Sequence, residues 1–88
     1  MRELEGKVAV VTGGSRGIGR ATASELSRAG ASVAVVARSR ERAQGTVDGL
    51  DGPGEAFACD VSNPAQCADL MSAVADCLGP VDILVNNA

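Results

Sequence analysis

The sequence predicts an α/β fold in which a parallel sheet of four strands is covered by helices on both faces. Short runs rich in Val, Ile, Leu and Ala alternate with longer segments of helical period. These runs lack the polar alternation of a half-exposed strand, which is typical of strands buried on both faces. Glycine and proline clusters separate the segments. The order β-α-β-α-β-α-β therefore predicts a single doubly wound domain over residues 1–88, with right-handed crossovers.

Two strands and two helices are expected in the first half of the chain. Residues 7–12 form a β-branched apolar run, and a helix is predicted from Gly17 to Gly30. The buried side of this helix is expected to carry Ile18, Thr22, Leu26 and Ala29. Residues 32–37 repeat the strand pattern. Residues 40–50 predict a weaker helix, because each of its two glycines costs about 1 kcal/mol relative to Ala.

The second half of the chain predicts two further strands, over residues 55–59 and 81–85. Between them Asn63 and Pro64 indicate a helix start, since Asn caps free N–H groups and Pro suits the first helical position. This helix is expected to end at Gly79. Its buried stripe is expected to consist of Cys67, Leu70, Met71, Val74 and Leu78.

The composition of the chain argues against two classes of binding partner, nucleic acids and anionic membranes. The chain has 88 residues, a formal net charge of -3 and one aromatic residue, Phe57. A chain with no basic face and no aromatic stacking surface is not expected to bind nucleic acid or an anionic membrane. No run approaches the roughly 18 apolar residues that span a bilayer, and the first six residues lack the apolar core of a signal peptide. We therefore expect a cytoplasmic location.

The cysteine and histidine content limits the chemistry. The chain has no His, which excludes a His-bearing zinc site and a Ser-His-Asp triad. The three cysteines, Cys59, Cys67 and Cys77, match no metal or redox spacing. We interpret them as reduced, small apolar residues and expect no metal site.

The first predicted strand runs into a glycine-rich turn, Thr12-Gly13-Gly14-Ser15-Arg16-Gly17-Ile18-Gly19. A strand, a glycine turn and a helix start in this order present backbone N–H groups to a phosphate. Polar residues also follow the other strands, at Arg38, Asp60 and Asn86-Asn87. Because the carboxyl ends of parallel strands meet at one edge of the sheet, we expect these positions to form one ligand site at the topological switch point.

The chain resembles the short-chain dehydrogenase/reductase family over essentially its whole length. The glycine turn is similar to the family's TGxxxGxG fingerprint, and residues 82–88, Asp-Ile-Leu-Val-Asn-Asn-Ala, are similar to its DxLVNNAG segment. Asp60-Val61 adds a third matching position, and the likeness is greatest to members of the 3-oxoacyl-acyl-carrier-protein reductase and carbonyl reductase type. The resemblance implies a Rossmann-type sheet, truncated here after the fourth strand, and a nicotinamide dinucleotide cofactor.

The resemblance also implies which residues contact this cofactor. They are Gly13, Gly14, Ser15, Arg16, Gly17, Ile18, Gly19, Arg38, Ser39, Asp60, Val61, Asn87 and Ala88. Gly13 is expected to permit the sharp turn, Gly17 the close approach of the pyrophosphate, and Gly19 tight helix packing. Ile18 is expected to pack under the cofactor.

Charge favours NADP(H) over NAD(H). At the end of the second strand, where NAD-binding members carry an acidic residue, this chain has Arg38, with Ser39 beside it and Arg16 in the turn. Guanidinium groups bind phosphate through bidentate, charge-assisted hydrogen bonds, which suits a ribose 2′-phosphate. Two alternatives stay open. Arg38 could be a solvated charge opening a basic helix, and Asp60, implied as the acceptor for the adenine amino group, could be only a helix-entry turn residue.

The resemblance places hydride transfer on residues that this chain does not contain. It implies an Asn, a Ser and a Tyr-x-x-x-Lys pair beyond residue 88, whereas the chain has no Tyr and a single Lys, Lys7. We therefore expect no catalytic residue and no catalysis by these 88 residues alone. We interpret the chain as the N-terminal cofactor-binding part of an NADP-dependent oxidoreductase acting on a carbonyl/alcohol pair.

Two other interpretations stay open. The chain could be a stand-alone, non-catalytic nucleotide-binding module, or an interaction module that pairs with full-length relatives. Its fourth strand is expected to form an uncovered apolar edge, which favours strand pairing or aggregation. We therefore expect the isolated chain to be marginally stable or self-associating, including as a homo-oligomer.

Overall fold

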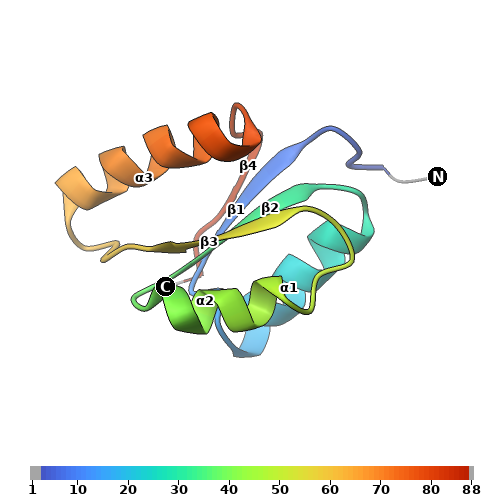
Figure 1. Cartoon of the computed structure of the whole chain (residues 1–88), viewed down its shortest axis with the longest axis horizontal. Helices are drawn as coiled ribbons and strands as arrows, with labels where there is room; N and C mark the ends of the chain where they lie inside the picture. Colours follow the sequence, from blue (N-terminus) through green and yellow to red (C-terminus); the bar gives the residue numbers. More distant parts are fainter. Residues whose placement is uncertain (1–2, 88) are drawn as a thin grey trace.

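A computed structural model describes residues 3–87 of the chain (Figure 1). Its elements, in chain order, are β1 (Val8–Thr12), α1 (Gly17–Arg28), β2 (Ser32–Ala37), α2 (Arg40–Val47), β3 (Gly54–Ala58), α3 (Pro64–Leu78) and β4 (Ile83–Val85). Strands and helices alternate along the chain, as the sequence predicts. Ala88, one of the predicted cofactor contacts, lies outside the described residues.

The four strands form one parallel sheet in the order β3-β2-β1-β4. Val10 of β1 pairs with Ala34 of β2 on one side and with Leu84 of β4 on the other. The chain adds β2 and β3 on one side of β1 and then crosses the sheet through α3 to place β4 on the opposite side. The predicted Rossmann-like, doubly wound sheet is confirmed, and its topological switch point lies between β1 and β4.

Helices cover both faces of the sheet. Figure 1 shows α1 and α2 on one face and α3 on the other. The strand side chains divide in the same way, because successive residues of a strand point to opposite faces. Val35 packs in one buried cluster with Ala23 of α1, whereas Val36 packs in the other with Val74 of α3. β1 and β2 supply most of the buried residues in both clusters, so these central strands are packed tightly on both faces and hold their carboxyl ends in place.

The buried side of α1 differs from the prediction. The fully buried residues of this helix are Gly19, Ala23 and Ser27, which recur every four positions. The expectation that Ile18 lies on the buried side is wrong, since Ile18 is 76% exposed. Small residues let the helix axis approach the sheet closely, and this approach turns the larger side chains of α1 outward.

Other differences affect the ends and faces of helices. α2 ends at Val47 instead of residue 50, because the amides of Gly49 and Leu50 donate to carbonyls three residues back in tighter turns. The expectation that Met71 lies in the buried stripe of α3 is also wrong, because Met71 is exposed. α3 contacts the sheet through Leu70 and Val74, and Met71 lies one residue further round the helix.

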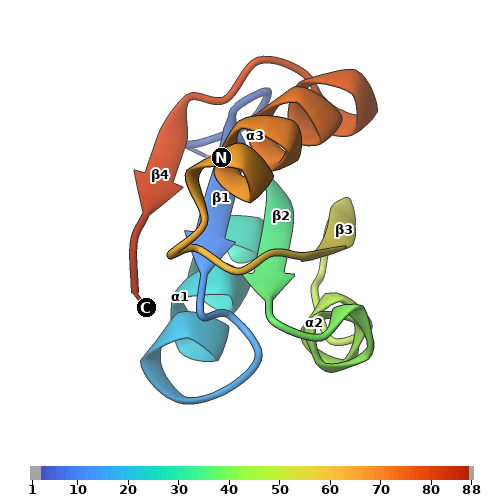
Figure 2. The ribbon, with the colours of Figure 1, turned by 90° about the vertical axis from the view of Figure 1, so that its left-hand side faces the viewer.

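β4 is the short edge strand next to β1 (Figure 2). Its register is fixed by Asp82, whose Oδ2 accepts a hydrogen bond from Val8 N and whose own amide donates to Val8 O, both at 2.9 Å. Leu84 is 59% exposed, and the two flanking residues of the strand are half-buried. The expected uncovered apolar edge is therefore present among the described residues.

Candidate functional site

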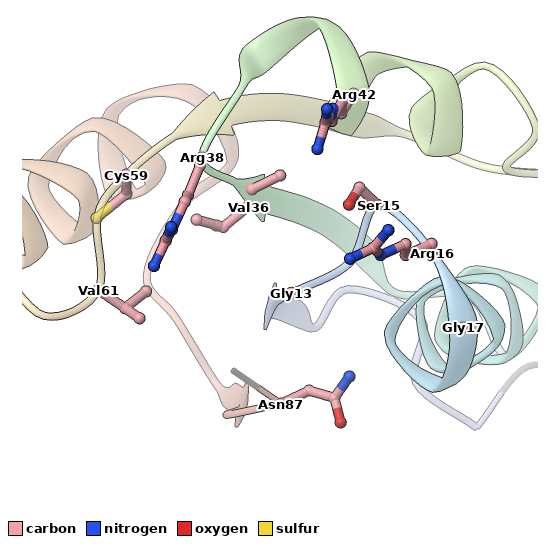
Figure 3. A pocket seen from close by; sticks show the side chains of 11 residues that line it. Gly13, Ser15, Arg16, Gly17, Val36, Arg38, Arg42, Cys59, Val61 and Asn87 are labelled. Atoms are coloured by element: carbon pink, nitrogen blue, oxygen red, sulfur yellow. The ribbon is translucent and has the colours of Figure 1, made fainter.

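A cleft of about 600 Å³ opens at the carboxyl ends of the strands (Figure 3). Its lining comes from all four strand ends and from the starts of α1 and α2. The lining residues are Gly13, Ser15, Arg16, Gly17, Val36, Ala37, Arg38, Arg42, Cys59, Val61 and Asn87. The structure thus brings together the polar positions that follow the first, second and fourth strands, at the edge where a doubly wound fold binds ligands.

The glycine turn is held against the sheet by backbone bonds and by close packing. Gly13 has a φ of 65°, which favours glycine, and it starts the turn after β1. The amide of Gly14 donates to Val36 O at 3.1 Å, so this N–H is already used by the fold. The carbonyl of Gly14 accepts from the buried hydroxyl of Thr46 in α2, at 2.8 Å. The turn is therefore anchored to both β2 and α2.

Gly19 is required by the approach of α1 to this turn. A Cβ at Gly19 would overlap the carbonyl group of Gly13 and lie 2.9 Å from Asn87 Nδ2. Gly17 is different, because it has a φ of 60° and a Cβ there would meet no atom within 4 Å. Its glycine is required by backbone conformation, and the space above it stays open to the cleft.

The first turn of α1 presents backbone amides without a side-chain cap. Ser39 caps α2 by accepting from Arg42 N at 3.4 Å, and Asn63 caps α3 by accepting from Gln66 N at 3.2 Å. At the start of α1, Arg16 makes no side-chain cap hydrogen bond. The first amides of a helix have no partner within the helix, and the helix dipole makes them attractive to an anion. Among the described helices, only α1 lacks such a cap.

Thr12 joins the end of β1 to the end of β4. Its buried hydroxyl accepts from the amide of Asn87 at 3.0 Å and lies 3.2 Å from Asn86 Oδ1 and 3.4 Å from Val85 O. These contacts fix the backbone of Asn87 at the cleft. The side chain of Asn87 lines the cleft (Figure 3), whereas the side-chain oxygen of Asn86 lies against the Thr12 hydroxyl.

Three guanidinium groups face the cleft, and one of them was not predicted. Arg16 lies in the glycine turn, Arg38 follows β2, and Arg42 lies in the first turn of α2. Figure 3 shows Arg38 extending toward Val61 and Arg42 extending toward Ser15. Arg40, between the latter two in sequence, instead lies 3.7 Å from Glu55 in an ion pair. The helical period separates Arg42 from Arg40, and this was the available sequence signal for Arg42.

Asp60 is committed to the turn that leads into α3. Its Oδ1 accepts from the amide of Ser62 at 3.0 Å and from the Ser62 hydroxyl, at 2.6 Å. These hydrogen bonds, with a smaller contribution from the charge of Arg38, lower the pKa of the Asp60 carboxyl below its ordinary value. Asp60 does not line the cleft, so the geometry favours its alternative interpretation as a helix-entry residue.

Cys59 lines the cleft, whereas the sequence analysis interpreted it only as a small apolar residue. It directly follows β3, is buried, and its amide donates to Ala37 O at 2.9 Å. Burial, together with a hydrogen bond to Cys67 and the charges of Cys67 and Asp60, raises the pKa of the Cys59 thiol. All three cysteines are free thiols, with Cys67 half-buried and Cys77 exposed. That the cysteines are reduced stays a prediction, and the exposure of Cys77 does not suit the interpretation of this residue as a packed, small apolar one.

The predicted contacts thus fall into two groups among the described residues. Those that line the cleft are Gly13, Ser15, Arg16, Gly17, Arg38, Val61 and Asn87. Those that lie behind or beside it are Gly14, Ile18, Gly19, Ser39 and Asp60. Ile18 instead borders a separate apolar groove along α1, with Leu4 and Leu26. Val36, Ala37, Arg42 and Cys59 were not predicted, because burial in a strand and helical position do not show which residues reach a cavity.

Comparison with known proteins places this chain among the short chain dehydrogenases, the family that its sequence resembles. The family model of the short chain dehydrogenases matches residues 7–88. A 3-oxoacyl-[acyl-carrier-protein] reductase of Vibrio cholerae is 49% identical over 85 residues, which cover 97% of this chain and 35% of the relative. A short-chain dehydrogenase/reductase homolog of Bacillus subtilis is 46% identical over 86 residues, which cover 93% of this chain and 79% of the relative.

Solved structures share the fold as well as the sequence. A hydroxysteroid dehydrogenase of Escherichia coli superposes with a TM-score of 0.93 at 39% identity, over 97% of this chain and 37% of that one. A citronellol catabolism dehydrogenase of Pseudomonas aeruginosa superposes with a TM-score of 0.94 at 34% identity, over 99% and 38%. The chain therefore spans little more than a third of the length of these structures. Within residues 3–87, no helix is long and apolar enough to cross a membrane.

Proposed function

This chain belongs to the short-chain dehydrogenase family, and we propose that it forms the NADP(H)-binding part of an oxidoreductase acting on a carbonyl/alcohol pair. Members of this family use a nicotinamide dinucleotide cofactor. The observation that carries the proposal is the cleft at the strand ends, into which the uncapped start of α1 and three arginines project.

The pyrophosphate is assigned to the start of α1. The open space above Gly17 lets a phosphate approach the backbone, and the free first-turn amides supply donors with a favourable helix dipole. Ser15 lies in the same turn and lines the cleft, so its hydroxyl is available as a further donor. Asn87, whose backbone amide is fixed by Thr12, lines the same cleft and is assigned to the cofactor ribose.

The ribose 2′-phosphate is assigned to Arg38 and Arg42, with Arg16 on the glycine turn nearby. All three side chains line one cleft, and Arg42 brings a second guanidinium from α2 to the side of the predicted Arg38. A dianionic phosphate gains charge-assisted hydrogen bonds from such groups, whereas a ribose hydroxyl does not neutralise them. This difference supports NADP(H) over NAD(H). The location of Ser39 at the cap of α2 places it beside this pair.

A titration of NADPH and NADH against the folded chain tests the cofactor assignment. We expect NADPH to bind more tightly, and we expect Arg38→Asp to weaken NADPH binding by about ten- to hundred-fold, the range expected for hydrogen bonds to a charged group. Arg40→Asp makes the same charge change two residues away, outside the cleft, and is the matched control. Equal affinities for the two dinucleotides, or an unchanged preference in Arg38→Asp, would remove the case for a 2′-phosphate.

The substrate class is proposed from the relatives alone. The Vibrio cholerae relative is named as a 3-oxoacyl-[acyl-carrier-protein] reductase, which supports a 3-oxoacyl thioester or another carbonyl compound as substrate. A reductase needs a proton donor at the substrate carbonyl, and these 88 residues contain no Tyr and no His for that role. We therefore propose that the chain is not catalytic alone. Carbonyl-dependent oxidation of NADPH by the chain alone would contradict this.

An interaction role is the second candidate function, and the open edge of the sheet favours it. β4 pairs only with β1 in the described sheet and exposes Leu84, which suits pairing with another copy or with a full-length relative. A chain that binds neither dinucleotide and elutes above its monomer mass in size-exclusion chromatography would favour this candidate. For both candidates we propose a cytoplasmic location.

A further inference from the structure

Thr46 is a buried polar residue of α2 that binds a residue of a different element. It is 2% exposed, and its hydroxyl donates to Gly14 O at 2.8 Å. A threonine in a helix often donates to a carbonyl three or four residues back in the same helix. Because a hydroxyl has one hydrogen, donation to Gly14 replaces that local bond. The hydroxyl of Thr46 therefore joins α2 to the glycine turn between β1 and α1.

This bond is the polar link between α2 and the glycine turn. Among the hydrogen bonds of residues 3–87, no other side chain of α2 binds a residue of that turn. Ala43 and Val47 of the same helix pack by apolar contact against the sheet. Apolar packing is non-directional, whereas a hydrogen bond holds two atoms at a defined distance. An eight-residue helix is marginal by itself, so the position of α2 depends on such contacts.

Arg42 lies on the same side of α2 as Thr46, one helical turn closer to the start of the helix. Residues four apart in a helix lie one above the other. The bond from Thr46 to Gly14 therefore places Arg42 near the next residue of the turn, Ser15. Figure 3 shows Arg42 extending toward Ser15, and both residues line the cleft. The start of the Arg42 side chain is thus placed relative to the turn by the hydrogen bond of Thr46.

We propose that Thr46 is a positioning residue of the dinucleotide site, which sets the distance from Arg42 to the glycine turn and thereby favours a dinucleotide with a phosphate on its adenosine ribose. This role rests on the proposed function, which assigns that phosphate to Arg38 and Arg42 and the pyrophosphate to the start of α1. A ligand that carries both anionic groups must reach α2 and α1 together, whereas NADH lacks the group that Arg42 binds. Only the phosphorylated dinucleotide therefore depends on the spacing that Thr46 maintains.

Titrations of Thr46→Val with NADPH and with NADH measure this dependence. The substitution keeps the β-branched shape and removes the donor. We expect NADPH binding to weaken about three- to ten-fold, the factor that corresponds to one lost hydrogen bond, and NADH binding to weaken by less than about two-fold. Partial unfolding weakens both dinucleotides by the same factor, so the ratio of the two affinities separates positioning from stability. An unchanged ratio would overturn the proposal.

Two control substitutions accompany this titration. Thr22→Val makes the same change in α1, at the separate apolar groove outside the cleft, and is expected to change neither affinity. Thr46→Ser keeps the donor and is expected to keep most of the preference for NADPH. If Thr46→Val does not fold, Thr46→Cys, which retains only a weak donor, takes its place. An equal loss of preference with and without the hydroxyl would show that the hydrogen bond does not position Arg42.

A double-mutant cycle tests whether Thr46 acts through Arg42. Arg42→Gln removes the charge and is itself expected to lower the preference for NADPH. Adding Thr46→Val to Arg42→Gln is then expected to change the ratio of the two affinities by less than about two-fold, because the group that Thr46 positions is already absent. Effects on the ratio that multiply independently would contradict the proposed path.

NMR spectra of the ligand-free chain distinguish a failure of this role from a failure of the proposed function. In Thr46→Val we expect shifts in the signals of the Ser15 amide and of the Arg42 side-chain N–H, while in Thr46→Ser both stay close to those of the parent chain. If the parent chain binds neither NADPH nor NADH, the proposed function fails and the cofactor preference fails with it. The spectra still decide whether Thr46 positions Arg42, and signals that do not move in Thr46→Val would overturn that positioning.

Discussion

Two glycines in helices of this chain are expected to respond to alanine in opposite directions. Gly19 lies in the first turn of α1, and Gly45 lies within α2. A Cβ at Gly19 would overlap the Gly13 carbonyl, whereas a Cβ at Gly45 would meet no atom within 4 Å. Both residues have ordinary helical backbone, since neither is among the glycines of positive φ. The two substitutions therefore differ mainly in packing.

The expected sizes follow from two opposing terms. Alanine is favoured over glycine in a helix by about 0.5–1 kcal/mol, so Gly45→Ala is expected to stabilise the chain by that amount. At Gly19 the same gain is opposed by overpacking, which costs typically about 1–3 kcal/mol. The overlapping atom belongs to the backbone of the turn and cannot rotate away as a side chain does. Gly19→Ala is therefore expected to be destabilised, with a free energy of unfolding about 1–3 kcal/mol below that of Gly45→Ala.

Urea unfolding and thermal melts of the two variants and the parent chain measure this difference. For a chain of this length, each kcal/mol shifts Tm by about 4–8 °C, which is easily resolved. Displacement of the Gly13 carbonyl also changes the cleft, so Gly19→Ala is expected to weaken NADPH binding while Gly45→Ala leaves it unchanged. If Gly19→Ala is stabilised as much as Gly45→Ala, the close approach of α1 to the turn is not what the structure describes.

Two further predictions concern the anchors of the site. Thr46→Val removes the hydroxyl that donates to the Gly14 carbonyl, and it is expected to lower the free energy of unfolding in urea by about 1–3 kcal/mol. Thr46→Ser keeps the hydroxyl and should lose less stability. Equal losses of stability in the two variants would show that the hydrogen bond is unimportant. Ser62→Ala removes one donor to Asp60, and an NMR titration should show the pKa of this carboxyl moving up toward its ordinary value. Because the folded pKa is lowered, the carboxylate stabilises the fold above its unfolded pKa, and this contribution is lost as pH falls through the folded pKa. A pKa of Asp60 that does not change in Ser62→Ala would contradict the assigned cause.

Periodicity and strand ends were enough to predict the fold and much of the site. Val10 and Val36 lie in apolar runs without polar alternation, which indicated buried parallel strands. The alternation of strands and helices then determined which strand ends meet, so Gly13, Arg38 and Asn87 could be placed at one cleft before any coordinates. Each of these predictions depended on a local pattern and on the known handedness of crossovers.

The missed features depend on distances between elements, which a local pattern does not contain. Ile18 was expected on the buried side of α1 because of its helical spacing with Thr22, Leu26 and Ala29, yet the helix approaches the sheet through Gly19 and Ala23. Arg42 was not predicted, because the helical period places it on a different face of α2 from Arg40 but does not show that this face borders the cleft. In both cases the sequence pattern gives the face of a helix but not how closely that face approaches its neighbours.

The contacts of Gly19 show that the glycine turn and the fourth strand are one unit. Because Gly19 has no Cβ, there is room beside it for the Gly13 carbonyl and for the side chain of Asn87. The backbone amide of Asn87 donates to the hydroxyl of Thr12 at the end of β1. The turn that receives the pyrophosphate in the proposed function is therefore packed directly against the residue assigned to the ribose. A dinucleotide bound across this cleft would contact residues from β1, α1 and the end of β4 together, and binding to the folded state alone stabilises that state. The short edge strand β4 should accordingly gain the most protection from hydrogen exchange when NADPH is bound, since its pairing with β1 is otherwise limited to three residues.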